Sequence, residues 1–349
     1  MALITLYLGY LIVALCACLV VKFTKLKSSS LEIEEQKVSV TFIIPFRNEQ
    51  ANLNQLLKSW RAQKISFKHE LILVDDHSNI EFSPSIGIAE VSVIRNKGIG
   101  KRDALITGFE QASGAYIYLL DADVDLPNKQ VLHQNITQIL TQHADLLIGE
   151  VVAEEPKEIN FSLLQAIEWN AMQTMTKFFI IIKKPILCAG ANLLFKGRHK
   201  SELIQALTAQ QTASGDDLTI LSYFKKSNSK IVSGQHAAAI KIRFSDELEA
   251  MLHQKLRWMK KMQKQFGLAS FIGIFMLIMQ VYLFVVPFLG NTAHTIVVYL
   301  TKFIADHLLY RRISWKSMIL WLPLQIYPLI LFFLQFIITP KWKGRVIKY

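Results

Sequence analysis

The chain has 349 residues, of which 52% are hydrophobic, and its formal net charge is +12. The apolar share exceeds that of an ordinary soluble domain, so we expect membrane segments beside one sizeable globular domain. A net positive charge of this size favours binding to an anionic lipid surface, a negatively charged substrate or nucleic acid. Nucleic acid is the least favoured partner, because no basic run is interleaved with aromatic residues.

The N-terminal segment is apolar and uncharged over residues 2–21. This length fits a bilayer-spanning helix, and the lack of a positive stretch before it disfavours a cleaved secretory signal. Lysines follow directly, so the positive-inside rule places the N-terminus outside and the next domain in the cytoplasm. We therefore expect a membrane helix over 1–22, a polar linker over 23–37, and a multi-pass protein of the cell (inner) membrane.

From residue 38 the pattern becomes that of an α/β domain, expected to extend over 38–265. Buried β-branched runs alternate with segments of helical spacing, which predicts βαβ units and a mainly parallel sheet. Such sheets bind ligands at the carboxyl ends of their strands, where polar residues gather in this chain. The expected strands are "VSVTFIIP", "ELILVDD", "VSVIRN" and "AYIYLLDADVD", and the expected helices are "NLNQLLKSWRAQ" and "KRDALITGFEQA".

The C-terminal part is again apolar. We expect an interfacial helix over about 246–265, apolar segments over about 267–289, 293–310 and 317–338, and a basic tail over 339–349. The second segment contains Lys302 and Asp306 at i,i+4 spacing, and such a pair inside a membrane is expected to self-pair or to face protein. The third is interrupted by Pro323 and Pro328. Three simple crossings would leave the basic tail outside, against the positive-inside rule, so this third segment is the candidate for a re-entrant or interfacial one.

Two pairs of carboxylates follow expected strands. "DADVD" places Asp121 and Asp123 where a strand ends, and hard divalent cations prefer such oxygen ligands, often sharing them with substrate phosphates. "VDDHS" repeats the theme at Asp75 and Asp76, where a carboxylate can accept hydrogen bonds from a base or ribose. An ordinary turn that closes the strand is the alternative reading of both pairs.

"NKGIGKRDAL" places two glycines and two lysines before a helix. The glycines allow close backbone approach, while Lys97 and Lys101 could neutralise phosphate at a helix N-terminus. Further on, "TASGDDLT" holds Asp216 and Asp217, which taken alone read as a solvated turn, a metal site or a catalytic base. In "HQKLRW", Gln254, Arg257 and Trp258 share one helical face; this suits an interfacial helix and also a polar acceptor at the membrane surface.

In their order and spacing these motifs resemble a membrane-bound family 2 glycosyltransferase of the GT-A fold, a Rossmann-like nucleotide-diphospho-sugar transferase domain. The resemblance covers 38–265, and the membrane layout agrees with it. Two departures stand out: Gly215-Asp216 replaces the Thr-Glu of the T-E-D form, and the glycines of "GIGK" are spaced differently from the commonest form. The matching segments are "FIIPFRNE", "VDDHS", "NKGIGKRDAL", "DADVD", "CAGANLLFKG", "GDD", "QKLRW" and "WKGR".

The resemblance implies an inverting transferase that moves a sugar from a nucleotide-diphosphate sugar, with a UDP-sugar favoured, to a hydroxyl of a lipid or lipid-linked acceptor. It implies a divalent metal (Mg²⁺ or Mn²⁺) on Asp123, with Asp121 bridging metal or ribose, and Asp217 as general base beside Asp216. The remaining implied contacts are Pro45, Asn48, Glu49, Asp75, Asp76, Lys101 and Asp121 for the nucleotide donor, and Gly190, Asn192, Gln254, Arg257 and Trp258 for the acceptor or diphosphate.

Two other functions compete with this one. A processive polysaccharide synthase of the same family also carries Q-x-x-R-W, but the few membrane segments after the domain favour a single transfer. A non-catalytic membrane protein that senses nucleotides, or a transporter, is the rival of another class. Its only support is the intramembrane pair Lys302 and Asp306.

Overall fold

The computed structural model describes residues 2–24, 38–84, 91–210, 215–264, 267–310, 314–343 and 345–346. They fall into two compact units, each considered by itself below. The helical unit comprises Met1–Lys25, Ala153–Ile186 and Phe244–Ile347, and the sheet unit comprises Leu26–Val152 and Leu187–Arg243. Most of the predicted linker, residues 25–37, lies outside the described residues. This division differs from the single expected domain over 38–265, because 153–186 and 244–264 group with the apolar helices.

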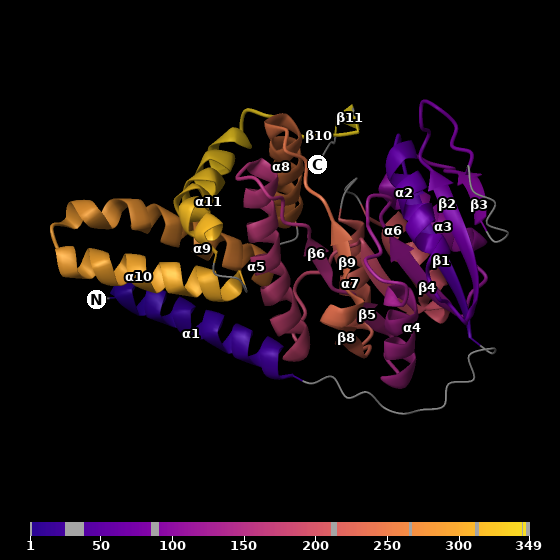
Figure 1. Cartoon of the computed structure of the whole chain (residues 1–349), viewed down its shortest axis with the longest axis horizontal. Helices are drawn as coiled ribbons and strands as arrows, with labels where there is room; N and C mark the ends of the chain where they lie inside the picture. Colours follow the sequence, from indigo (N-terminus) through magenta and orange to yellow (C-terminus); the bar gives the residue numbers. More distant parts are fainter. Residues whose placement is uncertain are drawn as a thin grey trace. The chain divides into compact units, whose positions relative to one another are not determined.

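The sheet unit is built on a seven-stranded sheet with the order β3-β2-β1-β4-β7-β5-β8 (Figure 1). The strands β3, β2, β1 and β4 are mutually parallel, β7 is antiparallel to β4 and β5, and β8 is parallel to β5, which confirms the mainly parallel sheet. The strands are β1 (Ser39–Phe46), β2 (Lys68–Asp75), β3 (Val91–Arg95), β4 (Tyr116–Leu120), β5 (Leu146–Ile148), β7 (Asn192–Lys196) and β8 (Ile231–Ser233), with β6 (Val151–Ala153) and β9 (Ile240–Ile242) as a separate pair.

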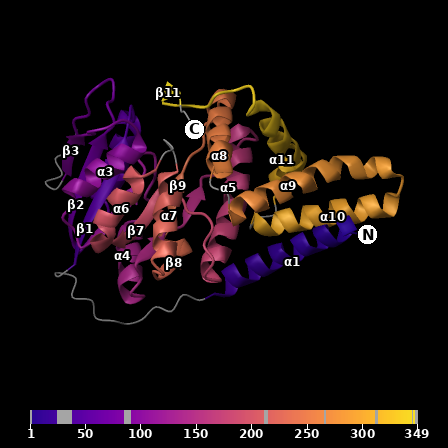
Figure 2. The same ribbon diagram turned by 180° about the vertical axis from the view of Figure 1, so that it is seen from behind.

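Helices cover both faces of this sheet (Figure 2). Successive side chains of a strand point to opposite faces. Phe42 of β1 meets Trp60 of α2 with ring centroids 4.5 Å apart, while its neighbour Ile43 meets Gly108 of α3, so these two helices lie on opposite faces. The helices of the sheet unit are α2 (Gln50–Arg61), α3 (Lys101–Gln111), α4 (Val131–Thr141), α6 (Lys200–Thr208) and α7 (Asp216–Lys226), with short 3₁₀ turns η2 (Gly197–His199) and η3 (His236–Ala238).

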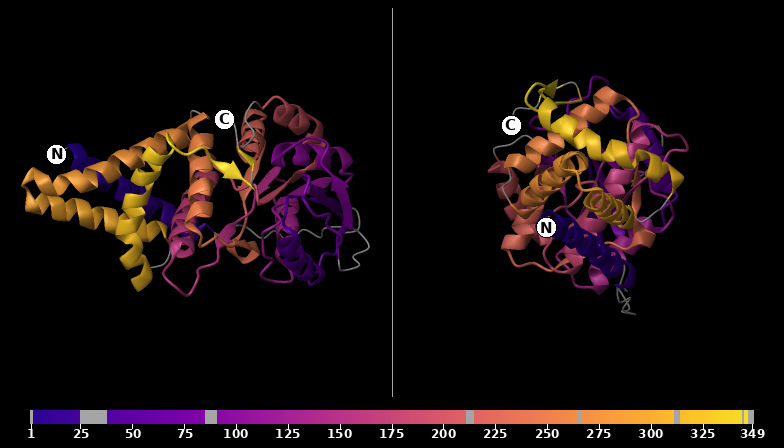
Figure 3. Two further views of the ribbon diagram at one scale, coloured as in Figure 1. Left: turned by 90° about the horizontal axis from the view of Figure 1, so that it is seen from above. Right: turned by 90° about the vertical axis from the view of Figure 1, so that its left-hand side faces the viewer.

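The helical unit holds the N-terminal helix and the C-terminal helices (Figure 3). α9 and α10 form a hairpin whose turn uses Gly290 (φ 74°) and Asn291, whose side chain accepts a hydrogen bond from the His294 amide at 2.9 Å. The elements are α1 (Ala2–Phe23), α5 (Phe161–Ile181), α8 (Leu248–Lys264), α9 (Leu268–Val285), η4 (Val286–Leu289), α10 (Thr292–Leu309), α11 (Trp315–Leu334), β10 (Lys341–Trp342) and β11 (Arg345–Val346).

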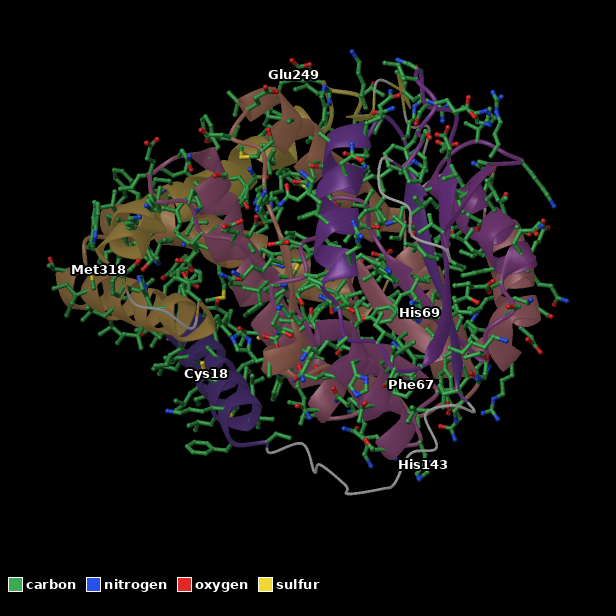
Figure 4. The ribbon with its side chains drawn as sticks, turned by 45° about the vertical axis from the view of Figure 1, so that its right-hand side comes forward. Cys18, Phe67, His69, His143, Glu249 and Met318 are labelled. Carbon is green, nitrogen blue, oxygen red and sulfur yellow. The ribbon has the colours of Figure 1, made fainter. Side chains whose placement is uncertain are left out.

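A buried polar hub joins α1, α10 and α11. The Lys302 ammonium lies 2.6 Å from both carboxylate oxygens of Asp306, and both side chains are almost fully buried, which confirms the expected self-pairing. Asp306 also accepts hydrogen bonds from Tyr10 (2.8 Å), Trp321 (2.9 Å) and Gln325 (3.0 Å). The carboxylate therefore joins the neighbouring helices α10 and α11 to α1, which is far away in sequence. Nearer the end of α1, Cys18, labelled in Figure 4, adds a 2.7 Å contact to the Leu308 carbonyl.

Among the described residues, three helical stretches are long and apolar enough to cross a membrane: Ile4–Phe23, Ser270–Leu289 and Trp315–Leu334. We expected three such C-terminal segments, but α10 does not qualify by composition. Besides Lys302 and Asp306, α10 carries His294 and His307, and these four polar side chains lower its mean hydropathy. The expected interruption of the last segment is wrong, because α11 continues through Pro323 and Pro328 as one helix.

Candidate active site

The candidate site lies at one edge of the sheet, where β1, β2, β3, β4, β5 and β8 end and the antiparallel β7 begins. About half of the predicted site residues of the sheet unit, Asp76, Asp121 and Asp123 among them, follow these strand ends closely. The opposite edge carries none of them; there Phe67 and His69, labelled in Figure 4, mark the start of β2. The expectation that polar residues gather at the carboxyl edge is therefore confirmed for the described part of the sheet.

The loops after β1 and β2 are joined by hydrogen bonds. The Asn48 amide donates to the Ser78 hydroxyl, and the Asn48 side chain accepts from the Asn79 amide, both at 2.8 Å. Asn48 and His77 have positive φ, at 52° and 57°, a conformation that asparagine tolerates better than most residues. Arg47, which sequence reasoning missed, donates to the backbone carbonyls of Asp76 and His77. Its only sequence signal was its place within "FRNE".

The other predicted residues of this edge have separate positions. Pro45 is buried within β1, beside Val74 of β2, so it shapes the strand. Glu49 precedes α2 and accepts a hydrogen bond from Asn52 at 2.5 Å. The carboxylate of Asp75 accepts from the Ser78 amide at 2.8 Å and forms a local turn. An ordinary turn that closes the strand was the alternative that the sequence offered for Asp75.

Asp76 fastens the loop in front of α3. It is 1% exposed, and its carboxylate accepts from the Asn96 side chain and from the Gly100 amide, each at 2.8 Å. Gly100 has φ 97°, which explains the glycine at the start of the helix. Asp76 therefore holds the loop that carries Lys101. Asn96, which also accepts a hydrogen bond from Thr107, was not among the predicted residues, because its partner Asp76 lies 20 residues earlier.

The two lysines of this loop have different partners. The exposed Lys97 pairs with Glu110 on α3, 2.5 Å away. Lys101 instead turns its ammonium to within 2.5 Å of Asp121 at the end of β4, and both side chains are about three-quarters buried. Burial opposes the charge of Lys101, but Asp121, and after it Asp216 and Asp217, raise the pKa of its ammonium above the ordinary value.

The acid pair of "GDD" faces the same place. Gly215 has φ 109°, and α7 begins at Asp216, so both carboxylates lie in the first turn of a helix, where negative charge is favoured. A Cβ added to Gly190 would lie 3.4 Å from Asp217 Cβ, 3.5 Å from the Lys101 ammonium and 3.7 Å from Asp216 Oδ2. The structure therefore brings Lys101, Asp121, Gly190, Asp216 and Asp217 together. We call these five residues the acidic cluster.

Asn192 has a different environment. Its side chain is fully buried, accepts from the Tyr118 hydroxyl at 2.7 Å and donates to the Glu150 carbonyl at 3.1 Å. It also packs against Gly149, where any Cβ would collide with its amide. These contacts leave none of the Asn192 side chain exposed to an acceptor. Asn192 instead holds β7 next to β5.

A further pair of residues at this edge was missed. Glu150 follows β5 and is 6% exposed, and its carboxylate lies 2.8 Å from Nδ1 of His236, which follows β8. The strand that places Glu150 has three residues, too short for a recognisable alternation of apolar and polar side chains.

The residues at the end of β4 suit a divalent cation. Asp121 already attracts a cation, the Lys101 ammonium, and the exposed Asp123 follows two residues later. Among the described residues no group of three or more histidine, cysteine, aspartate or glutamate side chains could hold a metal by itself. Mg²⁺ commonly binds one or two carboxylates and completes its shell with substrate phosphates and water. Asp121 and Asp123 fit that kind of metal, which is bound together with a phosphorylated ligand.

The residues of Q-x-x-R-W lie on α8 of the helical unit. Lys255, which is 3% exposed, donates to Glu168 of α5 and lies 4.6 Å from the ring centroid of Trp258. Trp258 also meets Trp169 of α5, with ring centroids 5.6 Å apart. Trp258 thus helps to fix α8 to α5. The donor or acceptor roles of Gln254, Arg257 and Trp258 stay predictions.

A mainly parallel, Rossmann-like sheet with acids and a lysine at its carboxyl edge defines the class: an α/β domain of the kind that binds ligands at this edge. Residues 41–200 match the family model "Glycosyl transferase family 2". The matched segment belongs to this glycosyltransferase family, and the sheet unit has its GT-A fold.

Individual proteins resemble the chain over shorter or longer segments. An undecaprenyl-phosphate 4-deoxy-4-formamido-L-arabinose transferase of Pseudomonas fluorescens (strain SBW25) is 34% identical over 101 residues, 26% of this chain and 30% of that protein. The transferase of the same name from Pseudomonas aeruginosa (strain LESB58) is 34% identical over 124 residues, 33% of this chain and 36% of that protein. The chain thus spans about a third of these relatives.

Among solved structures, a mannosyltransferase from Pyrobaculum calidifontis in complex with GDP-Man and Mn²⁺ superposes with a TM-score of 0.53. The superposition covers 96% of this chain and 99% of the mannosyltransferase, at 13% sequence identity. At that identity the likeness concerns the fold.

Proposed function

We propose that the protein is an inverting glycosyltransferase that moves one sugar from a nucleotide-diphosphate sugar to a lipid or lipid-linked acceptor at a membrane. The acidic cluster is the observation that carries the proposal, because it gathers Lys101, Asp121, Asp216 and Asp217 at the ligand-binding edge of a family 2 sheet. The apolar helices support a multi-pass protein of the cell (inner) membrane, with the sheet unit facing the cytoplasm.

In the proposed reaction, an acceptor oxygen attacks C1 of the donor sugar from the face opposite the diphosphate. The bond from this oxygen to C1 forms as the bond from C1 to the diphosphate oxygen breaks, and the nucleoside diphosphate leaves with the electron pair. With a hydroxyl acceptor, Asp217 takes the proton. We assign the donor contacts to Asp75 and Lys101, and the positioning of their loops to Asn48 and Asp76.

A divalent metal belongs to this proposal. Bound by Asp121 and Asp123, it would supply Lewis-acid stabilisation of the leaving diphosphate. The related fold from Pyrobaculum calidifontis contains Mn²⁺ with GDP-Man, which supports the choice of Mn²⁺ as a probe. We expect Asp123→Ala to weaken Mn²⁺-dependent binding of UDP or GDP in calorimetry, with binding in EDTA as the matched baseline. Equal Mn²⁺-dependent affinities of variant and wild type would exclude Asp123 as a metal ligand.

The acceptor is proposed from two sources. The sequence resemblance implies a hydroxyl, whereas the relatives are named for undecaprenyl phosphate. A phosphate monoester loses its second proton near pH 6, so at neutral pH it needs no general base. The two acceptor classes therefore make different demands on Asp217, and this difference can be measured.

The direct test supplies purified protein in lipid vesicles with Mn²⁺, radiolabelled UDP- and GDP-sugars, and either a polyprenyl phosphate or diacylglycerol. We expect label to enter the organic phase with one acceptor class, and mass spectrometry to show the mass of one added sugar. A ladder of products would identify the processive synthase instead. Tight nucleotide binding without turnover for any acceptor would favour the sensor and overturn the proposal. Lipids from cells with and without the gene give the same comparison in vivo.

A further inference from the structure

The Lys101 ammonium and a divalent metal would need the same carboxylate. The ammonium lies 2.5 Å from Oδ1 of Asp121, one of the two residues that the metal proposal assigns to the cation. Asp216 and Asp217 also act on Lys101 electrostatically. The ammonium therefore pairs with Asp121 and lies near Asp216 and Asp217, which approach the same glycine, Gly190.

It is unfavourable for the Lys101 ammonium and a divalent metal to bind the carboxylate of Asp121 at the same time. Two cations that share one carboxylate repel each other at close range, and the repulsion is stronger in a partly buried site than in water. Lys101 leaves Asp121 more easily once a new anion is present, and the diphosphate of a donor is such an anion. Lys97 offers no equivalent, since its ammonium pairs with Glu110 on the surface of α3.

We propose that Lys101 is a resident countercation of the acidic cluster, which the divalent metal displaces from Asp121 and which then pairs with the donor diphosphate. The inference rests on the proposed function and adds an order of events to it. In the absence of donor, Lys101 opposes the metal. In its presence, the lysine and the metal bind the same diphosphate and no longer compete. Metal and donor therefore bind as a pair, and the metal alone binds weakly.

The first test measures the affinity for Mn²⁺ without nucleotide, from the electron paramagnetic resonance of the free ion. We expect Lys101→Met to bind Mn²⁺ about tenfold more tightly than wild type, a typical size for the coupling of two sites. The matched control, Lys97→Met, removes a lysine of the same loop and is expected to keep the wild-type affinity. In the presence of UDP or GDP, Lys101→Met is expected to bind the nucleotide more weakly. Unchanged or weaker Mn²⁺ binding by Lys101→Met would overturn the proposal.

The second test uses the wild-type protein and does not depend on the folding of a variant. Reductive methylation followed by peptide mass spectrometry reports how reactive each lysine is. We expect Mn²⁺ alone to increase the labelling of Lys101 and to leave Lys97 unchanged, because the displaced ammonium loses Asp121, its nearest carboxylate partner. A Lys101 reactivity that Mn²⁺ leaves unchanged or lowers would overturn the displacement.

Both tests omit the acceptor, so their outcome is separable from that of the proposed function. If the protein transfers sugar but Lys101 and the metal do not compete, only the further inference fails. If Mn²⁺ displaces Lys101 but no acceptor is glycosylated, only the proposed transfer fails.

Discussion

At the scale of single residues, the acid pair Asp216 and Asp217 acquires its meaning from its neighbours. Both lie in the first turn of α7, a position where adjacent acids are common, because the helix end favours negative charge. The feature that separates them from such acids is the approach of Lys101 and Gly190 from other elements. Asp216 and Asp217 therefore belong to the acidic cluster, in addition to lying at the N-terminus of α7.

Asp217→Asn distinguishes the acceptor classes. With a hydroxyl acceptor we expect kcat to fall by about 10²–10⁴-fold, the usual contribution of a general base, while donor affinity is kept. With a polyprenyl phosphate we expect a smaller loss, because the attacking oxygen is already ionised. The measurement is initial-rate kinetics on both acceptors together with calorimetry of nucleotide binding. Wild-type kcat on a hydroxyl acceptor would exclude Asp217 as the base.

The sequence located most of the residues of this edge but could not distinguish their roles. Asp75 and Asp76 are adjacent acids after the same strand, yet Asp76 is buried under Gly100 and Asp75 closes a local turn. Likewise Lys97 and Lys101 share one loop and have different partners. Asp76, Lys97 and Lys101 take these roles from partners 13 or more residues away, which local patterns do not encode.

At the scale of elements, Glu70 connects β2 to β1 and to the segment after α3. Its carboxylate accepts from the Thr41 hydroxyl at 2.5 Å and from the Ser113 amide and hydroxyl at 2.9 and 2.8 Å. Burial opposes its charge, but these hydrogen bonds, with help from Lys200, lower the pKa of Glu70 below its ordinary 4.5. A depressed carboxyl pKa stabilises the fold above the ordinary pKa, and this stabilisation disappears as the pH falls through the lowered value.

Glu70→Gln is therefore expected to lower the thermal unfolding temperature at pH 7. The difference from wild type should narrow as the pH falls below about 4.5. Circular dichroism melts across this pH range measure it, with the exposed Glu202→Gln as control. A difference that stays constant with pH would show that the charge of Glu70 contributes nothing.

Gly108 sets the distance between α3 and β1. A Cβ at this position would lie 2.5 Å from Ile43 Cγ2, in a fully buried contact. We expect Gly108→Ala to destabilise the fold by about 1–3 kcal/mol through overpacking, despite the better helix propensity of alanine. Urea unfolding measures the change, and Gln111→Ala on the exposed side of the same helix is the control. A stabilised Gly108→Ala variant would contradict this packing.

Elements with a long apolar run or a helical spacing were predictable, and shorter ones were not. The four predicted strands lie where their apolar runs indicated, and α2 and α3 lie where the helical spacing indicated. β5 and β8 have three residues each and leave no such pattern. α11 was expected to break at its prolines, but an apolar helix of 20 residues packed within its unit continues through them.

At the scale of the whole molecule, the polar hub fastens the first helix of the chain to the last two. Asp306→Leu would leave the Lys302 ammonium buried without its carboxylate, so we expect a loss of about 3–5 kcal/mol in unfolding free energy. The double substitution of Lys302 and Asp306 by leucine removes both charges and is expected to recover part of this loss. Unfolding in detergent micelles measures both. If Asp306→Leu were as stable as the double leucine variant, the charges of Lys302 and Asp306 would not be energetically coupled.

The hub also has a consequence for how the protein is made. Tyr10 and Asp306 are 296 residues apart, so the first helix leaves the ribosome long before its partner exists. Lysine and aspartate each cost about 3 kcal/mol when a helix enters the bilayer through the translocon. In the proposed membrane topology, the contact of Asp306 with Tyr10 offsets part of that cost for α10. We therefore expect that a generic signal anchor in place of α1 would still target the nascent chain, but that the hairpin of α9 and α10 would then be poorly retained in the bilayer.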